Sequence, residues 1–317
     1  HLILQKKRLQ NKIAESRCSL PATLAGAIAV WAYAGLKDAS LWPTTAIMLI
    51  ASLVVMELNN ANALIRIYSR MVSCAFVAFV TMTIFLYVFG HTSIVTLCAA
   101  LAYLLLFKCY QDNRSPGWVF YAFACIGIAS TVWVQMLFFV PFLWIIMSTK
   151  LQCMSLRTFV ASILGLIMPY WFFIAYFVLT NQPERFIAHF EELVTFGPLF
   201  NFPSSFTFPQ WGAVAFILLC ALIGGCHFFV TRFNDKIRIR MLYDTFITID
   251  VLALIFIIFQ PQHIAPLSGL IALNSAPLIA HFLALSHGRI SNCTTIVLFI
   301  LSIILIIANL WEVLQRF

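Results

Sequence analysis

The side chains of this chain that could do chemistry are few, and the most informative are ionisable or amide groups inside long apolar runs. A charged group surrounded by hydrocarbon is strongly unfavourable unless it is paired or neutral. Such residues therefore mark proton or ion paths, or buried hydrogen-bonded contacts that hold two helices together, which we call clasps. Two consecutive apolar segments carry this polar cluster: Asp244 and Asp250 in 242–259, and Asn274 and His281 in 265–285.

The two segments are joined by a short, proline-containing turn, so we expect them to pack side by side and antiparallel. Residues at the same depth in the two antiparallel helices should then face each other. This places Asp250 beside Asn274, and Asp244 beside His281. Asp250 can be a protonated, hydrogen-bonded clasp, or an ionised group beside water in a proton or ion path. The clasp is favoured, because no Lys or Arg lies at the depth of Asp250.

A second polar group lies in the loop expected at 57–70. Amide and guanidinium side chains here can hydrogen-bond across helix ends, or hold the phosphate of a lipid headgroup. A structural cap for the neighbouring spans is the favoured interpretation. The residues of this group are Asn59, Asn60, Asn62 and Arg66.

The segment 180–210 is expected to be an extracytoplasmic amphipathic loop that carries one surface helix. Pro183 suits a first helical turn, and apolar residues follow at helical spacing from Phe186 to Val194. The helix is either a lid that seals the bundle, or a gate for an amphipathic ligand. Its polar side chains are Glu184, His189, Glu191 and Glu192.

Metal and cofactor chemistry is not indicated. His91, His189 and His263 stand singly on three separate loops, in a spacing that matches no ligand motif. The nine cysteines form no CxxC pair and avoid the expected outer loops, which is typical of free thiols. We therefore expect no metal and no cofactor, and assign no catalytic residue.

The composition indicates which kind of secondary structure must position these residues. The chain is 62% hydrophobic and 9% charged, with a mean hydropathy of +0.97. A soluble core cannot bury that much apolar surface, so the chain is expected to be an all-α, polytopic transmembrane helical bundle. The net charge of +8 lies in scattered cytoplasmic loops and requires no nucleic acid.

The distribution of basic residues orients the spans. Only Lys37, Arg185 and Arg316 fall outside in the best threading, which leaves sixteen of the nineteen Lys and Arg residues on the cytoplasmic side, together with the N-terminus. This threading predicts about nine full spans in a single transmembrane domain, 1–317. The spans are 21–36, 41–57, 71–89, 92–107, 158–179, 211–231, 242–259, 265–285 and 293–312.

One stretch does not fit a simple count of spans. Residues 115–149 carry no charge, yet Arg114 and Lys150 at the two ends both belong on the cytoplasmic side. This length exceeds one span and is too short for two, since a full span needs about twenty residues. We therefore predict a short hairpin of two helices, near 118–131 and 134–148, rather than one tilted span.

Four parts of the sequence carry a resemblance to a known group of proteins. They are the 57–70 segment, Tyr110–Arg114, Gln135 and Pro169–Tyr170. Over about residues 50–180, and more faintly near 277–311, the chain resembles an uncharacterised family of polytopic inner-membrane proteins from Bacteroidota-type bacteria. The resemblance implies a location in a bacterial inner membrane. It implies no activity.

Three classes of function remain open. The leading hypothesis is a non-catalytic subunit of an envelope complex, whose partners are the lipid bilayer and other membrane proteins. The second is an enzyme or carrier-handling protein of envelope glycolipid or polysaccharide synthesis, which the hairpin and the amphipathic loop favour. The third is a secondary transporter that uses Asp250.

Overall fold

The protein is described by a computed structural model that covers residues 8–39, 41–87 and 90–315. These residues form thirteen α-helices and five short 3-10 helices, and no strand occurs among them. The prediction of an all-α helical bundle is confirmed. The basic residues Lys6, Lys7 and Arg316, which contribute to the expected orientation, lie outside the described residues.

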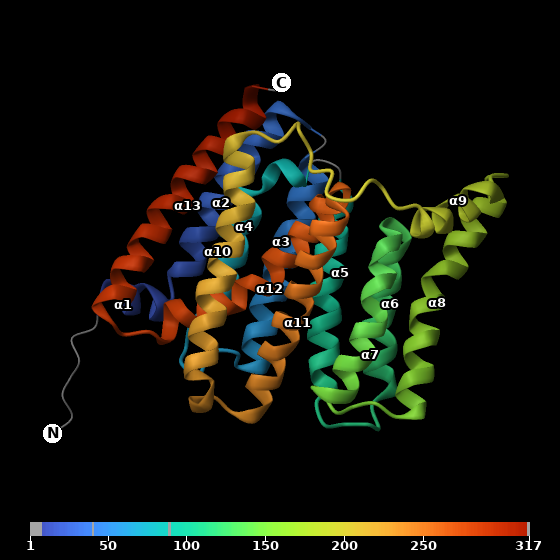
Figure 1. Ribbon diagram of the computed structural model, residues 1–317, viewed down its shortest axis with the longest axis horizontal. Helices are drawn as coiled ribbons and strands as arrows, with labels where there is room; N and C mark the ends of the chain where they lie inside the picture. Colours follow the sequence, from blue (N-terminus) through green and yellow to red (C-terminus); the bar gives the residue numbers. More distant parts are fainter. Residues whose placement is uncertain (1–7, 40, 88–89, 316–317) are drawn as a thin grey trace. The chain divides into compact units, whose positions relative to one another are not determined.

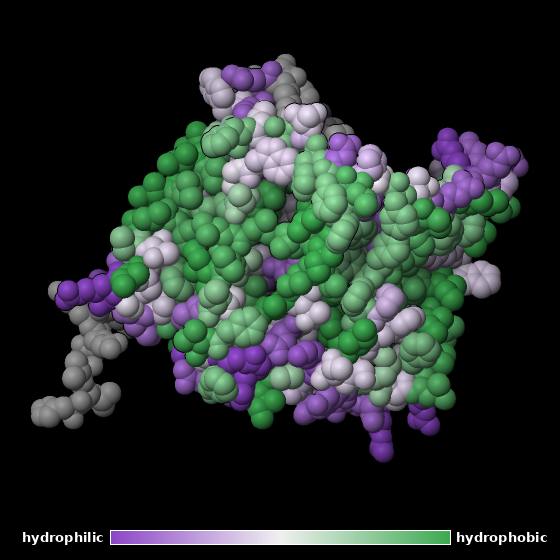
Figure 2. Space-filling model, viewed as in Figure 1, coloured by the Kyte–Doolittle hydropathy of each residue, from purple (hydrophilic) through white to green (hydrophobic). Residues whose placement is uncertain are grey.

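Within the described residues, eight helices are long and apolar enough to cross a membrane, as in an integral, multi-pass membrane protein. In Figure 2, apolar side chains cover most of the visible surface of α8 and α13. Apolar groups at such positions are suited to contact lipid chains. The spanning segments are Ser19–Leu36, Leu41–Asn62, His91–Cys109, Leu156–Leu179, Phe208–Asn234, Ile237–Phe259, Pro261–Leu285 and Arg289–Glu312.

The chain folds into two compact units that each use separate stretches of sequence. Unit 1 contains residues 1–88, 206–236 and 272–317, and unit 2 contains 89–205 and 237–271. The helix α12 (Ile264–Leu285) contributes to both. Unit 1 also holds α1 (Leu9–Glu15), α2 (Ser19–Lys37), α3 (Leu41–Asn62), α4 (Met71–Met82), α10 (Phe208–Thr231) and α13 (Arg289–Gln315).

Helix α4 is central to unit 1, where it packs against α2, α3 and α13 (Figure 1). Helix α10 lies against α13 and also makes a close approach to α12, because Gly224 leaves no room for a Cβ beside the backbone of Leu278. Small residues allow helix backbones to approach in this way.

Unit 2 is built around the parallel pair of α6 (Pro116–Val132) and α8 (Leu156–Leu179). A Cβ on Gly127 would lie 2.7 Å from the carbonyl oxygen of Leu166, and a Cβ on Gly165 would lie even closer to the backbone of Phe120. The remaining helices of the unit are α5 (His91–Leu106), α7 (Val140–Thr149), α9 (Pro183–Val194) and α11 (Ile237–Phe259).

The predicted hairpin of two short helices is confirmed. The chain runs up α6, turns through a 3-10 helix at Val134–Phe139, and returns along α7 (Figure 1). The two ends of the hairpin meet, since the backbone N–H of Gln111 donates to the carbonyl oxygen of Leu151 at 2.8 Å. Pro141 does not break the second arm, because it occupies the first turn of α7, where a missing N–H costs no helical hydrogen bond.

Two expected boundaries were wrong. The span expected at 71–89 is the twelve-residue helix α4 followed by a 3-10 turn, Ile84–Leu86, and its last two residues lie outside the described chain. The loop expected from residue 57 begins later, because α3 continues to Asn62 and ends before Ala63, whose φ is +49°. The 71–89 run carries no charged residue, and its sequence did not show where the helix ends.

Candidate functional site

Unit 2 carries an apolar groove with a volume of about 620 Å³. Aromatic side chains dominate its walls, and several of them are exposed. No charged residue lines it. The lining residues are Phe138, Phe139, Phe142, Phe196, Gly197, Leu199, Leu252, Ile255, Phe256, Phe259 and Gln260.

Three elements form the groove. The turn and second arm of the hairpin supply one wall, and the segment that follows α9 supplies another. The third wall is one face of α11, since Leu252, Ile255 and Phe259 recur at helical spacing. The edge-to-face contact of Phe138 with Phe256, whose centroids lie 5.8 Å apart, joins the hairpin wall to the helix wall.

A buried amide holds the segment after α9 in place. The side chain of Gln260 accepts a hydrogen bond from the backbone N–H of Gly197 at 2.9 Å and donates to the carbonyl oxygen of Gly197 at 3.2 Å. Gln260 is itself buried at the end of α11. Both ends of its amide are thus used, and the groove wall is fixed to the helix by a pair of hydrogen bonds.

The predicted surface helix is present as α9, and it docks on the tip of the hairpin. The Nε2 of His189 lies 2.9 Å from the carbonyl oxygen of Ser130, so Nε2 carries the proton and donates. Gln135 donates to the carbonyl oxygen of Glu192 at 3.3 Å. Burial lowers the pKa of His189, while the Ser130 carbonyl and Glu192 oppose that shift. The acidic residues Glu184, Glu191 and Glu192 are all exposed.

A second histidine at this end of unit 2 also has a structural partner. The indole N–H of Trp133 lies 3.2 Å from Nδ1 of His263, which therefore accepts. The same imidazole packs 5.7 Å from the ring of Phe256, a groove residue. The polar side chains around the groove thus hold protein segments together.

The four residues of the expected intramembrane cluster belong to different units. Asp244 and Asp250 lie in unit 2, and Asn274 and His281 lie in unit 1. Asp244 forms an ion pair with Lys150, with 3.2 Å between Nζ and Oδ2. Asp250, Asn274 and His281 are all buried. The pairing by depth across the two spans therefore stays a prediction.

The polar side chains of the segment 57–70 make hydrogen bonds within unit 1. Asn59 donates to the carbonyl oxygen of Ser69 at 2.9 Å, which ties α3 to the residues just before α4. Asn62 donates to its own helix at Leu58, and Asn60 is exposed. Arg66 reaches the carbonyl oxygen of Asn234 at 3.5 Å.

Two sets of residues were missed from the sequence. The groove phenylalanines look like any other apolar residues of this chain, and only the fold reveals that they line one groove. Asp235 was overlooked in the basic 232–240 loop, although it is the one acidic residue there. An isolated acid among four bases was the available signal for a buried partner.

Among the described residues, no group of three or more His, Cys, Asp or Glu side chains is arranged to hold a metal ion. No protein-family model matches the chain, and neither a curated protein nor a solved structure shows significant similarity to it.

Proposed function

We propose that this protein binds the hydrocarbon chain of an envelope lipid in the groove of unit 2, and serves as a non-catalytic subunit of a complex that handles that lipid. The observation that carries the proposal is the aromatic groove of about 620 Å³ bounded by the segment after α9. This volume lies within the range of ligand sites, roughly 300–1,000 Å³.

The groove suits hydrocarbon rather than water or a polar ligand. A water molecule needs two or more polar partners, and the only polar side chain in the lining, Gln260, is already bonded to Gly197. An empty groove would forfeit dispersion contacts along its aromatic walls. Transfer from the bilayer itself supplies no hydrophobic gain, so selectivity has to come from the shape of the walls.

The non-catalytic role is supported by how the neighbouring polar groups are used. Gln135, His189 and His263 each bond to another part of unit 2. These contacts fix the hairpin, α9 and α11 around the groove, which is what a holding site requires.

A bacterial inner membrane with a cytoplasmic N-terminus is part of the proposal. It is supported by the excess of basic residues on one side of the threading and by the resemblance to proteins of Bacteroidota-type bacteria. In this orientation α9 and the groove face the outer leaflet, from which a lipid chain would enter.

The groove is tested by filling it with a larger side chain. Ile255→Trp places an indole in the lining, whereas Ile258→Trp makes the same change at an exposed position of α11 outside the lining. A phospholipid carrying a photoreactive acyl chain, reconstituted with each protein, should crosslink to the 196–199 and 252–259 peptides. We expect Ile255→Trp to lower this crosslinking about tenfold, which corresponds to ~1.4 kcal/mol of binding free energy.

The matched variant decides the result. Ile258→Trp should crosslink like the unmodified protein, because its indole lies outside the groove. Crosslinking of both variants at the level of the unmodified protein would mean that the groove holds no lipid chain. An equal loss in both would mean that lipids contact the α11 surface in general, and it would also contradict the proposal.

A further inference from the structure

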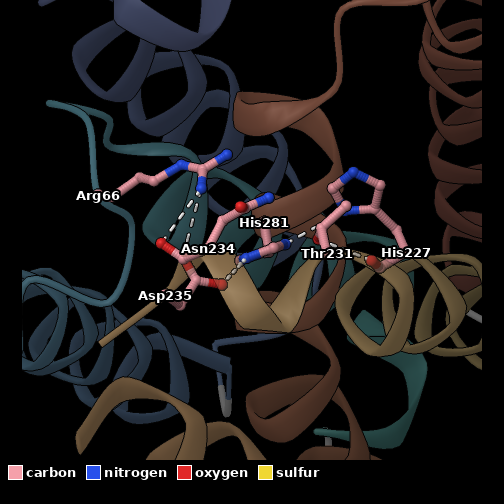
Figure 3. A network of polar contacts seen from close by, with 6 residues as sticks. All are labelled: Arg66, His227, Thr231, Asn234, Asp235 and His281. Atoms are coloured by element: carbon pink, nitrogen blue, oxygen red, sulfur yellow. Dashed lines mark hydrogen bonds and ion pairs between the residues drawn. The ribbon is translucent and has the colours of Figure 1, made fainter. Parts of the chain in front are cut away.

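Unit 1 contains a row of polar side chains that includes a buried carboxylate. Figure 3 shows Asp235, His281 and His227 in a row, with Arg66 beside the carboxylate. Nε2 of His281 lies 3.0 Å from Oδ2 of Asp235, and Nδ1 of His281 lies 3.2 Å from Nδ1 of His227. The side chains of Asp235 and His281 are 3% and 1% exposed. A buried carboxylate in contact with one imidazole, which in turn contacts a second, is the kind of group found in proton paths.

The fold brings these residues together from three elements. His227 lies in the last turns of α10, and Asp235 follows the 3-10 turn that ends that helix. His281 comes from α12, which approaches α10 closely at Gly224. Arg66 reaches in from the segment between α3 and α4, with 3.9 Å between Nη1 and Oδ1 of Asp235.

Arg66 supplies a positive charge at the Asp235 end of the row. Arg66 is 41% exposed in its side chain, so the Asp235 end reaches the aqueous face. At the other end, the ring of Phe282 packs 5.4 Å from His227. Arg232, from the turn after α10, lies over the rings of Phe228 and Phe229 at 5.5 and 5.7 Å.

The contacts impose a direction on the hydrogen bonds. A neutral imidazole has one N–H and one acceptor nitrogen. The carboxylate of Asp235, paired with Arg66, accepts from Nε2–H of His281. Nδ1 of His281 must then accept, so Nδ1–H of His227 donates to it. Nε2 of His227, which Figure 3 shows directed away from His281, is left as the acceptor at the far end.

We propose that Asp235, His281 and His227 form a relay that carries one proton between the aqueous face and the α10 side of unit 1. A hydronium ion gives its proton to Nε2 of His227. The Nδ1–H bond of His227 then breaks as its proton passes to Nδ1 of His281. The Nε2–H bond of His281 breaks in turn, and that proton forms the O–H bond of Asp235. One proton enters and one is held on the carboxyl, from which water beside Arg66 removes it.

Nitrogen-15 NMR of the full chain, labelled at histidine and reconstituted in lipid nanodiscs, tests the relay. The imidazole signals are assigned with His227→Gln and His281→Gln. At neutral pH we expect the proton on Nε2 in His281 and on Nδ1 in His227. In Asp235→Asn, which removes the carboxylate charge, the signals of both rings should move. His227 responds because His281 transmits the change.

Three further samples keep the result interpretable. Asp235→Glu retains the acceptor and should keep both tautomers. His287→Gln removes a histidine of the same unit that is bonded to Asn11, and should leave the relay signals unchanged. The proposal is overturned by the reverse tautomers, or by a His227 signal that does not respond to Asp235→Asn. A response of His281 to Asp244→Asn and not to Asp235→Asn would also overturn it, in favour of the pairing expected from depth.

Discussion

His189 joins the surface helix α9 to the hairpin through one hydrogen bond, and to α8 through two ring contacts. Its imidazole lies 5.0 Å from the ring of Phe173 and 6.3 Å from that of Tyr170, on the apolar side of α9. The sequence predicted this residue on an amphipathic helix. The carbonyl of Ser130 as its partner could not be predicted, because that contact depends on where the hairpin turns.

The depressed pKa of His189 makes the docking of α9 depend on pH. The docked imidazole binds a proton less readily than a solvated one, whose pKa is about 6.5. As the pH falls through that value, the undocked state takes up the proton first, and docking weakens. Hydrogen exchange of α9 amides, corrected for intrinsic rates, should show less protection at pH 5.5 than at pH 7.5.

The control for this pH effect is His189→Gln, whose amide can still donate to Ser130 but does not titrate. Its α9 protection should be the same at both pH values. Equal loss of protection in this variant on acidification would assign the effect to another group.

At the scale of helices, hydropathy and charge predicted the elements, and side-chain hydrogen bonds decided their ends. The hairpin could be predicted because Arg114 and Lys150 bracket an uncharged run that is too short for two spans. The end of α3 was misplaced because Asn59 and Asn62 look like loop residues. Their amides bond to Ser69 and Leu58, so the helix tolerates them.

The close pair of α6 and α8 gives a test at the same scale. Gly127→Ala would press a methyl group against the Leu166 carbonyl and the ring of Pro169, within 3.0 Å of each. We expect a loss of about 1–3 kcal/mol of stability, as for other overpacked sites. Gly117→Ala, on the same helix, meets no atom within 4 Å and should be neutral or slightly stabilising. Thermal unfolding in detergent measures both, and equal melting temperatures would contradict the packing.

At the scale of the whole molecule, the multi-pass build followed from composition, whereas the division into two units did not. The boundary near residue 271 falls inside the single helix α12, so no loop or linker in the sequence marks it. A unit assembled from three separate stretches is defined by contacts that one sequence cannot show. The groove and the relay each lie within one unit, and neither was visible as a motif.

Cysteine labelling tests the proposed membrane threading, which places α9 and the groove at the outer leaflet. Single cysteines at the exposed positions Ser205, Asp112 and Lys236 are introduced into a folded, cysteine-free background. An impermeant thiol reagent should label position 205 in intact cells, and positions 112 and 236 only after permeabilisation. Labelling of position 236 from outside, or protection of position 205, would contradict the threading.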